Sequence, residues 1–188
     1  MDTNEYWLER GKTYISEERL QAQFYKDQEE IFLLAARMED PVSVIDLGCG
    51  FGRITRVLAS TLTKTTFVGL DLSPEQVNNA RKHCRGLSNI GFRVQDICSD
   101  THKIGAFDMA VCSEVLLHLP EDSALKLIKK VLSTVRVLVH EVDPAWVCED
   151  EVSPHCFFHD YARIYGELNV KYWELSGKGH KLLVVKAT

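Results

Sequence analysis

The chain lacks most features that mark a secreted, membrane-spanning or nucleic-acid-binding protein. It has no apolar run long enough to cross a membrane, and its amino-terminal MDTNEYWLERGKTY is charged and aromatic rather than signal-like. Its six cysteines include no close Cys-x-x-Cys pair. The formal net charge of −5 provides no overall basic field to collect nucleic acid or an anionic membrane. We therefore expect a cytoplasmic protein with reduced cysteines that acts on a small molecule.

Internal repeats, low-complexity tracts and evident linkers are also missing from the sequence. With 188 residues the chain is long enough for one well-buried domain and short for two. We expect a single domain over residues 1–188, in which residues 1–40 form a helical lid and residues 41–188 form the core.

The most informative segment that is present is VIDLGCGFGR, residues 44–53. An apolar run there leads into glycines at alternate positions, which is typical of a buried strand followed by a loop that lies close to a ligand and then a helix. A Walker loop is excluded because no Gly-Lys-Ser/Thr ending follows, and a dinucleotide fingerprint would need its third glycine where Arg53 stands. The segment therefore predicts a nucleotide cradle of another kind, built on Gly48, Gly50 and Gly52.

Strand-like and helix-like patterns alternate along the rest of the chain. We expect strands at 42–47, 66–71, 90–94, 107–112 and 135–141, and a terminal hairpin of 170–175 and 180–187. We expect helices at 17–38, 53–60, 74–84, 121–133 and 160–169. Ser73, Pro74 and Gln76 supply an N-cap, a first-turn proline and a capping-box glutamine. The alternation predicts an α/β fold with a mainly parallel sheet and helices on both faces.

Polar residues stand where each predicted strand ends. Ligands of such sheets bind beyond the carboxyl ends of the strands, so these residues should share one edge of the sheet. They predict a polar mouth at that edge. The residues are Asp46, Asp71, Asp96, Ser113–Glu114 and Glu141–Asp143.

The sequence resembles the class I S-adenosylmethionine-dependent methyltransferases from about residue 42 to residue 186. VIDLGCGFG, VGLDLSPEQVNNAR, FRVQDI and FDMAVCSEVLLHLP resemble four motifs of that family, in the family's order. The resemblance implies a Rossmann-like doubly wound sheet of seven strands with an antiparallel carboxyl-terminal hairpin. It also implies S-adenosylmethionine as cofactor and S-adenosylhomocysteine as product.

By this resemblance the glycine loop lies against the methionine and ribose portions of the cofactor. Gly48, Gly50 and Gly52, with Cys49 among them, would form that surface, and Asp46 would lie near the ammonium group. Asp46 could also stabilise its own loop by accepting backbone hydrogen bonds, and the two roles are compatible.

The later motifs would hold the rest of the cofactor. Asp71 would accept hydrogen bonds from both ribose hydroxyls and Leu72 would pack on the adenine. Asp96 would accept from the adenine amine, the backbone of Ile97 would meet a ring nitrogen, and Ser113 would border the methyl group. As alternatives, Asp71 is a turn residue and Asp96 caps the segment after its strand.

Three histidines are candidate general bases for an acceptor of high pKa. His118 follows the fourth strand and could instead shape the pocket, and His159 could instead cap the next helix. His155 is a third candidate. Cys148, His155, Cys156 and His159 together suggest a zinc site. Their spacing is wider than zinc ligands prefer, so we expect no metal.

Aromatic residues are frequent in the segments left to cover the mouth. They could enclose a small organic acceptor or shield a sulfonium cation, although ordinary helix-to-sheet packing is an alternative for each. They are Tyr6, Trp7, Tyr14, Phe24, Tyr25, Trp146, Phe157, Phe158 and Tyr161.

The leading interpretation is methyl transfer to an oxygen or nitrogen of a small molecule. No Asn/Asp-Pro-Pro-Tyr follows the fourth strand and no Pro-Cys nucleophile is present, which argues against methylation of DNA bases. Two alternatives remain open. The chain could bind the cofactor as a regulatory partner without activity, or it could methylate RNA or protein docked on the helix that carries Arg81, Lys82 and Arg85, although a solvated helix face explains those cations too.

Overall fold

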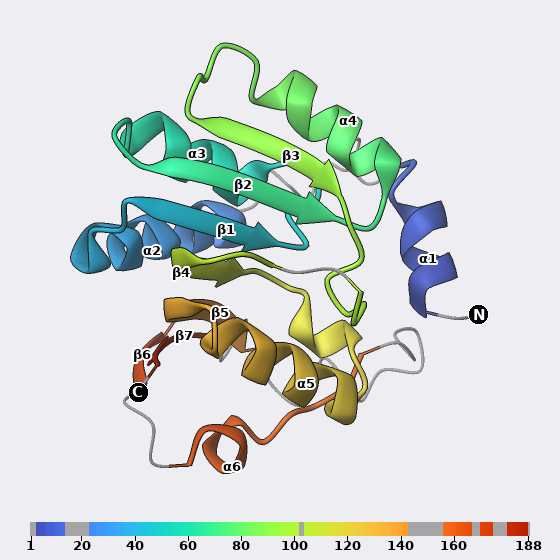
Figure 1. Ribbon diagram of the computed structural model, residues 1–188, viewed down its shortest axis with the longest axis vertical. Coiled ribbons are helices and arrows are strands. Elements are labelled where there is room, and N and C mark those ends of the chain that lie inside the picture. The colour runs from blue at the N-terminus through green and yellow to red at the C-terminus, as the bar shows by residue number, and fades with distance from the viewer. Residues whose placement is uncertain are drawn as a thin grey trace.

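The described residues form one seven-stranded sheet with helices on both faces (Figure 1). The computed structural model describes residues 3–13, 23–101, 104–142, 156–166, 170–174 and 180–187. The strand order is β3-β2-β1-β4-β5-β7-β6, with β1 to β5 parallel and β7 antiparallel to both β5 and β6. The strands are β1 Ser43–Leu47, β2 Thr66–Asp71, β3 Ile90–Val94, β4 Phe107–Cys112, β5 Val135–Val142, β6 Val170–Glu174 and β7 Lys181–Lys186.

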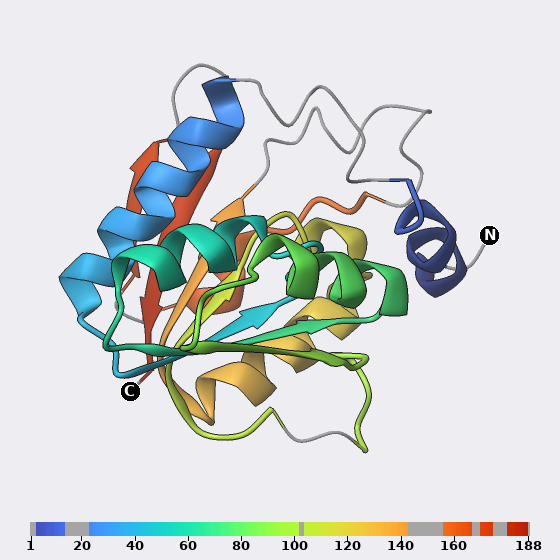
Figure 2. The same cartoon turned by 90° about the horizontal axis from the view of Figure 1, so that it is seen from above.

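Helices cover the sheet as two layers. Figure 2 shows α2, α3 and α4 on one face and α5 on the other, with α1 beyond the carboxyl ends of the parallel strands. The α-helices are α1 Thr3–Arg10, α2 Gln23–Glu39, α3 Arg53–Thr61, α4 Pro74–His83, α5 Glu121–Leu132 and α6 Tyr161–Tyr165, and a 3-10 turn, η3, spans Leu116–His118.

The apolar strands supply both cores because alternate residues of a strand point to opposite faces. Val44 of β1 packs in one cluster with Phe32 of α2 and Leu58 of α3, whereas its neighbour Ile45 packs in the other with Leu127 of α5. A sheet buried on both faces requires nearly continuous apolar strands, which explains the runs that mark β1 and β4 in the sequence.

The expected fold class and its antiparallel terminal hairpin are confirmed. Strands β2, β3 and β4 have the predicted bounds, and β1 and β5 differ by one residue at one end. The helix expected over 160–169 is described only as Tyr161–Tyr165, where Gly166 has a positive φ of 53°. Helix α1 was not predicted with bounds of its own. Of the helix expected over 17–38, the structure describes α2 from Gln23.

The start of α4 confirms one half of the predicted cap and corrects the other. Ser73 accepts the backbone N–H of Gln76 at 3.3 Å and Pro74 stands at the start of the helix. The side chain of Gln76 does not return to the Ser73 N–H as a capping box would. That N–H donates to Asp71 Oδ1 at 2.8 Å. The side chain of Gln76 turns elsewhere, and its Nε2 donates to the carbonyl of Gly11, also at 2.8 Å. The capping-box prediction was therefore wrong, and the glutamine ties the end of α1 to α4.

His140 of β5 is a fully buried histidine that stays neutral. Its Nδ1 donates to the carbonyl of Glu141 at 2.9 Å, and its Nε2 accepts the hydroxyl of Tyr165 at 2.6 Å. Burial lowers the pKa of His140 to about 4. In the unfolded chain this histidine is protonated near its ordinary pKa. Acidification therefore lowers the free energy of unfolding, because the unfolded state binds a proton that the folded state does not.

We expect His140→Phe to reduce the loss of stability on acidification. In the wild type the unfolded state binds the proton and the folded state does not between about pH 6.5 and pH 4, so stability falls by about 2 kcal/mol from pH 7 to pH 5 through this group. Urea unfolding of both proteins at pH 7 and pH 5 measures this difference. Equal pH dependence in the two proteins would contradict the expectation.

Candidate functional site

A glycine loop joins β1 to α3 at the carboxyl edge of the sheet. Its backbone enters the left-handed region three times, with φ of 71° at Gly48, 53° at Gly50 and 82° at Gly52. Two hydrogen bonds fix the loop: the N–H of Cys49 donates to the carbonyl of Leu70 of β2, and the N–H of Gly52 donates to the carbonyl of Cys49, both at 2.9 Å. Glycine avoids the steric cost that other residues pay in this conformation.

The space around the loop differs sharply between two of its glycines. A Cβ built on Gly48 would lie 2.5 Å from Cγ2 of Val115, so this glycine is needed for packing inside the protein. A Cβ on Gly50 would have no atom within 4 Å. The loop therefore presents bare backbone to open space at Gly50, as expected of a ligand cradle.

Asp71 closes β2 directly beside this loop. Its Oδ2 accepts the N–H of Gly50 and its Oδ1 accepts the N–H of Ser73, both at 2.8 Å. Burial raises the pKa of Asp71, and the two N–H groups oppose that rise. The turn role considered for Asp71 is real, but it leaves further acceptor capacity on both oxygens, because each carboxylate oxygen can accept two hydrogen bonds.

Asp46 lies deeper, at the end of β1. Its side chain is 2% exposed and accepts the hydroxyl of Thr55 of α3. Burial raises the pKa of Asp46 to about 7, with the Thr55 hydrogen bond and the charge of Arg53 opposing the rise. Asp46 thus braces the first turns of α3 through a side chain, where the sequence analysis considered backbone hydrogen bonds. Thr55 was not anticipated.

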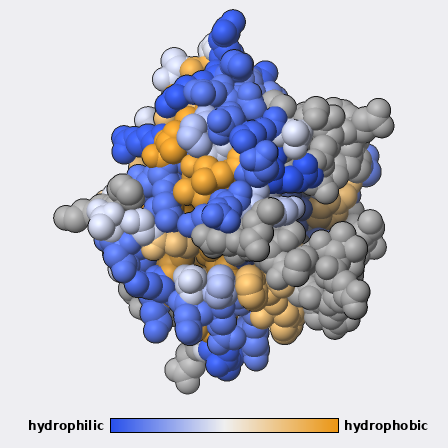
Figure 3. Space-filling model, turned by 90° about the vertical axis from the view of Figure 1, so that its right-hand side faces the viewer, coloured by the Kyte–Doolittle hydropathy of each residue, from blue (hydrophilic) through white to orange (hydrophobic). Residues whose placement is uncertain are grey.

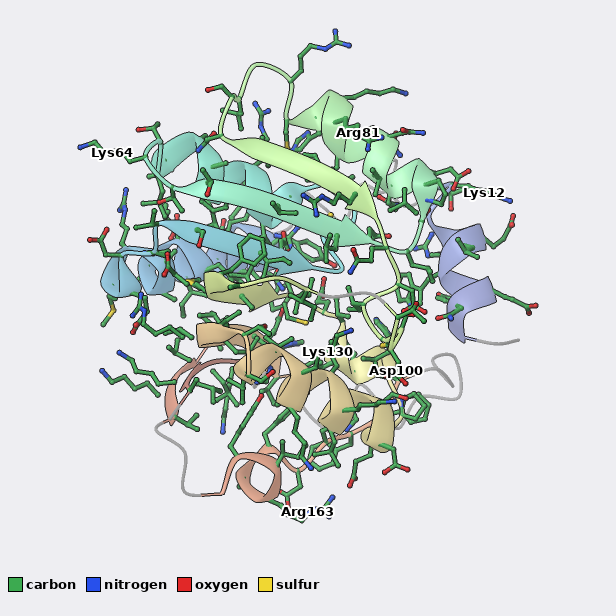
Figure 4. All side chains as sticks on the ribbon, in the orientation of Figure 1. Lys12, Lys64, Arg81, Asp100, Lys130 and Arg163 are labelled. Carbon is green, nitrogen blue, oxygen red and sulfur yellow. The ribbon has the colours of Figure 1, made fainter. Side chains whose placement is uncertain are left out.

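The segment after β3 carries the next predicted residues. Asp96 Oδ1 accepts the N–H of Cys98 at 2.8 Å, which is the local turn considered as an alternative. Ile97 is 8% exposed and packs into the core. Lys130 of α5 donates to the carbonyls of Ile97 at 3.4 Å and Ser99 at 2.8 Å, and Figure 4 shows this lysine reaching from α5 toward the segment. Leu72, after β2, is half-buried.

Helix α1 lies over the carboxyl edge of the sheet (Figure 1). The ring of Trp7 packs on that of His118 with centroids 4.5 Å apart, and the hydrogen bond from Gln76 to Gly11 anchors the far end of the helix. The helix thus bridges η3 and α4. On this side of the molecule, apolar side chains gather between hydrophilic ones (Figure 3).

The candidate histidines occupy different environments. His118 is half-buried, under Trp7, with its Nδ1 3.7 Å from Sγ of Cys156. His159 is 3% exposed, and its Nε2 donates to the carbonyl of Leu116 at 2.9 Å. The cap of α6 is not His159 but Asp160, which accepts the N–H of Arg163 at 3.1 Å.

Some residues considered in the sequence lie outside the part of the chain that the structure describes, among them His155 and Cys148. Among the residues described, no group of three His, Cys, Asp or Glu could hold a metal ion. Tyr14 and Trp146 also lie outside. No described helix is long and apolar enough to cross a membrane.

The described aromatics divide between the mouth and the core. Phe24 packs on the ring of His180 at 4.7 Å, and Tyr25 lies 4.8 Å from the guanidinium carbon of Arg53. Tyr161 packs between buried histidines on the face of the sheet that α5 covers, as the packing alternative proposed. The basic helix is partly explained as well, because Arg81 (Figure 4) donates to the carbonyl of Phe92 at 3.0 Å.

A buried polar cluster at the end of β5 joins two residues predicted for the polar mouth, Ser113 and Glu141, to two residues that were not predicted there, Gln28 and His180. We call Gln28, Ser113, Glu141 and His180 the β5-end cluster. Glu141 is 3% exposed; its Oε2 accepts from Gln28 Nε2 and, at 3.3 Å, from the hydroxyl of Ser113. Its Oε1 lies 3.5 Å from Nδ1 of His180. The acidic strand end was the only signal in the sequence, because α2 and β7 bring the other members from far along the chain.

Arg53 adjoins the cluster through Gln28. Its guanidinium donates to the side-chain oxygen of Gln28, to the carbonyl of Tyr25 and to Glu29, the latter two at 3.2 Å. The single amide of Gln28 therefore stands between the guanidinium and the carboxylate of Glu141.

Curated proteins with similar sequences match only part of the chain. A ubiquinone biosynthesis O-methyltransferase of Xanthomonas campestris is 35% identical over 95 residues, which are 49% of this chain and 39% of that protein. The corresponding enzyme of Xanthomonas oryzae is 35% identical over 86 residues, which are 44% of this chain and 34% of that protein. The matched region thus spans less than half the length of these relatives.

Solved structures share the fold over nearly the whole chain. The N-methyltransferase NodS of Bradyrhizobium japonicum, in complex with S-adenosylhomocysteine, has a TM-score of 0.80 at 19% identity and covers 99% of both chains. Magnesium protoporphyrin IX methyltransferase of Synechocystis, with bound S-adenosylmethionine, has a TM-score of 0.74 at 18% identity, covering 100% of this chain and 98% of that one.

One family model matches most of the sequence. It is described as a methyltransferase domain and matches residues 39–182, which include β1 to β6 and the start of β7. The matched segment contains the glycine loop, Asp71, Asp96 and Ser113, and its topology is that of the solved methyltransferases. The chain therefore belongs to the methyltransferase-domain family, with the Rossmann-like class I fold.

Proposed function

We propose that the chain transfers the methyl group of S-adenosylmethionine to an oxygen or nitrogen of a small-molecule acceptor and leaves S-adenosylhomocysteine. The observation that carries this proposal is the hydrogen bond from Gly50 to Asp71, which joins the open glycine loop and a strand-end carboxylate into one site. Membership of the family and the cofactors bound in its structural neighbours support the same conclusion.

The loop fits the methionine and ribose portions of the cofactor. Gly50 leaves bare backbone toward open space, while Gly48, Cys49 and Gly52 keep the loop in its shape. The remaining acceptor capacity of Asp71 suits the ribose diol, and Asp46 supplies negative charge for the ammonium group.

The next segments would complete the cofactor site. Leu72 packs on the adenine, the second oxygen of Asp96 accepts its amine, and the backbone of Ile97 meets a ring nitrogen. Lys130 would hold this segment in place through the Ile97 and Ser99 carbonyls. Ser113, at the end of β4, borders the methyl group and belongs also to the β5-end cluster.

Bound S-adenosylmethionine would supply an electrophilic methyl group on a sulfonium. The protein's part is to hold the acceptor in line and to exclude water, which accounts for much of the rate enhancement in such displacements. Helix α1 acts as the lid, with Trp7 and His118 shaping the mouth. We assign His118 to this boundary of the acceptor pocket. His159 holds η3 in place through its hydrogen bond to the carbonyl of Leu116.

The acceptor is proposed to be a small molecule met in the cytoplasm. The names of a curated relative, a ubiquinone biosynthesis O-methyltransferase, and of a structural neighbour, magnesium protoporphyrin IX methyltransferase, indicate small-molecule acceptors. The five described cysteines are free thiols. Neither nucleic acid nor a membrane is expected as a partner, given the net charge of −5.

Incubation with methyl-labelled S-adenosylmethionine and fractionated host extract tests the function. We expect label in small molecules and a dissociation constant for S-adenosylhomocysteine measurable by calorimetry. Label confined to RNA or protein would contradict the small-molecule assignment. Cofactor binding without label in any fraction would favour a regulatory partner.

The raised pKa of Asp46 predicts that cofactor binding depends on pH. A cationic ammonium group favours the ionised carboxylate, so below about pH 7 binding must first release the proton of Asp46. We expect the affinity for S-adenosylhomocysteine to fall about tenfold from pH 8 to pH 6. Calorimetry at both values measures it, and Asp46→Asn is the control that should remove the dependence. An equal pH dependence in the variant would assign the effect to another group.

A further inference from the structure

We propose that Lys130 of α5 is a positioning residue that sets the preference of the cofactor site for an adenine base. The lysine acts by holding the turn at residues 96–99, which carries the groups assigned to the edge of the adenine. The inference rests on the proposed methyltransferase function and deepens it. It assigns a determinant of specificity to a helix outside the four segments that resemble the family's motifs.

The turn begins where the sheet stops supporting the chain. β3 is an edge strand with β2 as its single neighbour, and the N–H of Gln95 donates to the carbonyl of Asp71 at 2.8 Å where that pairing ends. Beyond this point the turn closes on itself. Asp96 Oδ1 accepts the N–H of Cys98 at 2.8 Å, and the Asp96 carbonyl accepts the N–H of Ser99 at 3.4 Å. These bonds give the turn its shape, and its place in the molecule depends on other contacts.

Two contacts from outside the turn hold it in place. The side chain of Ile97 is 8% exposed and packs in the apolar core. The ammonium of Lys130, from the last turn of α5, donates to the carbonyl of Ser99 at 2.8 Å and to that of Ile97 at 3.4 Å (Figure 4). Apolar packing tolerates small rotations of the backbone, whereas hydrogen bonds to carbonyls are directional. The lysine therefore fixes the orientation of the peptide groups that follow Asp96.

The orientation of this turn decides which base it can bind. Under the proposed function, the second oxygen of Asp96 accepts the adenine amine and the backbone N–H of Ile97 meets a ring nitrogen. Hypoxanthine reverses both polarities, because an oxo group replaces the amine and the ring nitrogen carries a hydrogen. A fixed turn then sets acceptor against acceptor and donor against donor, and polar groups left unpaired in this way disfavour a ligand strongly. A turn that is free to move relieves both conflicts and loses the preference.

Lys126, one helical turn before Lys130, provides a matched comparison. Its Nζ pairs with Oδ2 of Asp100 at 2.6 Å, and the two side chains are 64% and 71% exposed. It brings the same charge to the same segment but contacts an exposed side chain instead of the backbone. Exposed ion pairs contribute little to stability, so the orientation of the turn should not depend on Lys126.

Calorimetry of the full chain with S-adenosylhomocysteine and S-inosylhomocysteine tests this role. We expect the wild type to bind the adenine ligand at least about 100-fold more tightly. Lys130→Met has no donor, and Lys130→Gln is too short to reach both carbonyls. Each should bind the adenine ligand about tenfold more weakly and the hypoxanthine ligand no more weakly, so the preference falls about tenfold. Lys126→Met should leave both affinities within about twofold of the wild type.

The ratio of the two affinities separates positioning from general damage to the fold. A structural defect would weaken both ligands equally, and an unchanged ratio in either folded variant at Lys130 would overturn the inference. An equal loss of preference in Lys126→Met would also contradict it, because charge rather than contact with the backbone would then be responsible. If near-ultraviolet circular dichroism showed that neither Lys130 variant folds, the lysine would serve the fold alone and the positioning role would be wrong.

The inference and the function on which it rests fail in different ways. If the wild type binds S-adenosylhomocysteine no more tightly than S-inosylhomocysteine, the contact between the turn and the adenine is wrong, and methyl transfer still stands. If the wild type binds neither ligand, the proposed function itself is wrong.

Discussion

Asp71→Ala is expected to weaken binding of S-adenosylhomocysteine by at least about 100-fold. Two hydrogen bonds from a ribose diol to a carboxylate contribute roughly 1.5–3 kcal/mol each, and both are lost. The variant also removes the acceptor of the Gly50 N–H, so the loop that carries the methionine portion loses its tie to β2. Isothermal titration calorimetry measures the effect directly.

Asp71→Asn is the matched control for this prediction. Asparagine keeps one acceptor oxygen and similar volume but loses the charge, so we expect an affinity between those of the wild type and of the alanine variant. Near-ultraviolet circular dichroism should show that both variants keep the fold, because the core beneath Asp71 is apolar and complete without it. Unchanged affinity in Asp71→Ala would overturn the ribose assignment.

Gly50→Ala is the second variant with a large expected effect. The added Cβ would meet no protein atom within 4 Å, so it cannot clash with the fold, but it would enter the open space assigned to the cofactor. We expect the affinity for S-adenosylhomocysteine to fall more than about tenfold, because a methyl group blocks close approach of a ligand to the backbone. Calorimetry again gives the measurement.

Backbone strain has to be separated from this blocking, and the chain offers a control. Gly86 also has a positive φ, 94°, and a Cβ there would also meet nothing within 4 Å, yet it lies in the turn after α4 and outside the proposed site. Both alanine variants should lose about 1 kcal/mol of stability from the left-handed backbone. Only Gly50→Ala should lose affinity; equal losses of affinity would attribute the effect to strain.

The strands could be predicted closely because each is a local apolar run bounded by turn residues. The cap of α4 shows where local rules stop. Ser73 and Pro74 act within the sequence neighbourhood and were correctly read, but the partner of Gln76 is Gly11, which only the folded chain brings near. The cap of α6 is a different case, because it is local: Asp160 rather than His159 caps the helix by accepting the N–H of Arg163.

The residues proposed to bind the cofactor could be selected from the sequence, since they lie in short motifs at strand ends. The contacts of those residues were less predictable. Thr55 as the partner of Asp46, and Lys130 as the anchor of the Ile97 and Ser99 carbonyls, come from helices on opposite faces of the sheet. They depend on packing between layers, which no spacing in the sequence encodes.

The sequence by itself determined the fold class, the strand order along the chain and the identity of the cofactor motifs, because these depend on periodicity, glycine and strand-end carboxylates within short segments. Only the tertiary structure decided which side chains meet at the carboxyl ends of β4 and β5. Gln28 of α2, Ser113 after β4, Glu141 of β5 and His180 before β7 come together only once the sheet aligns the ends of β4 and β5 and the antiparallel β7 lies beside them.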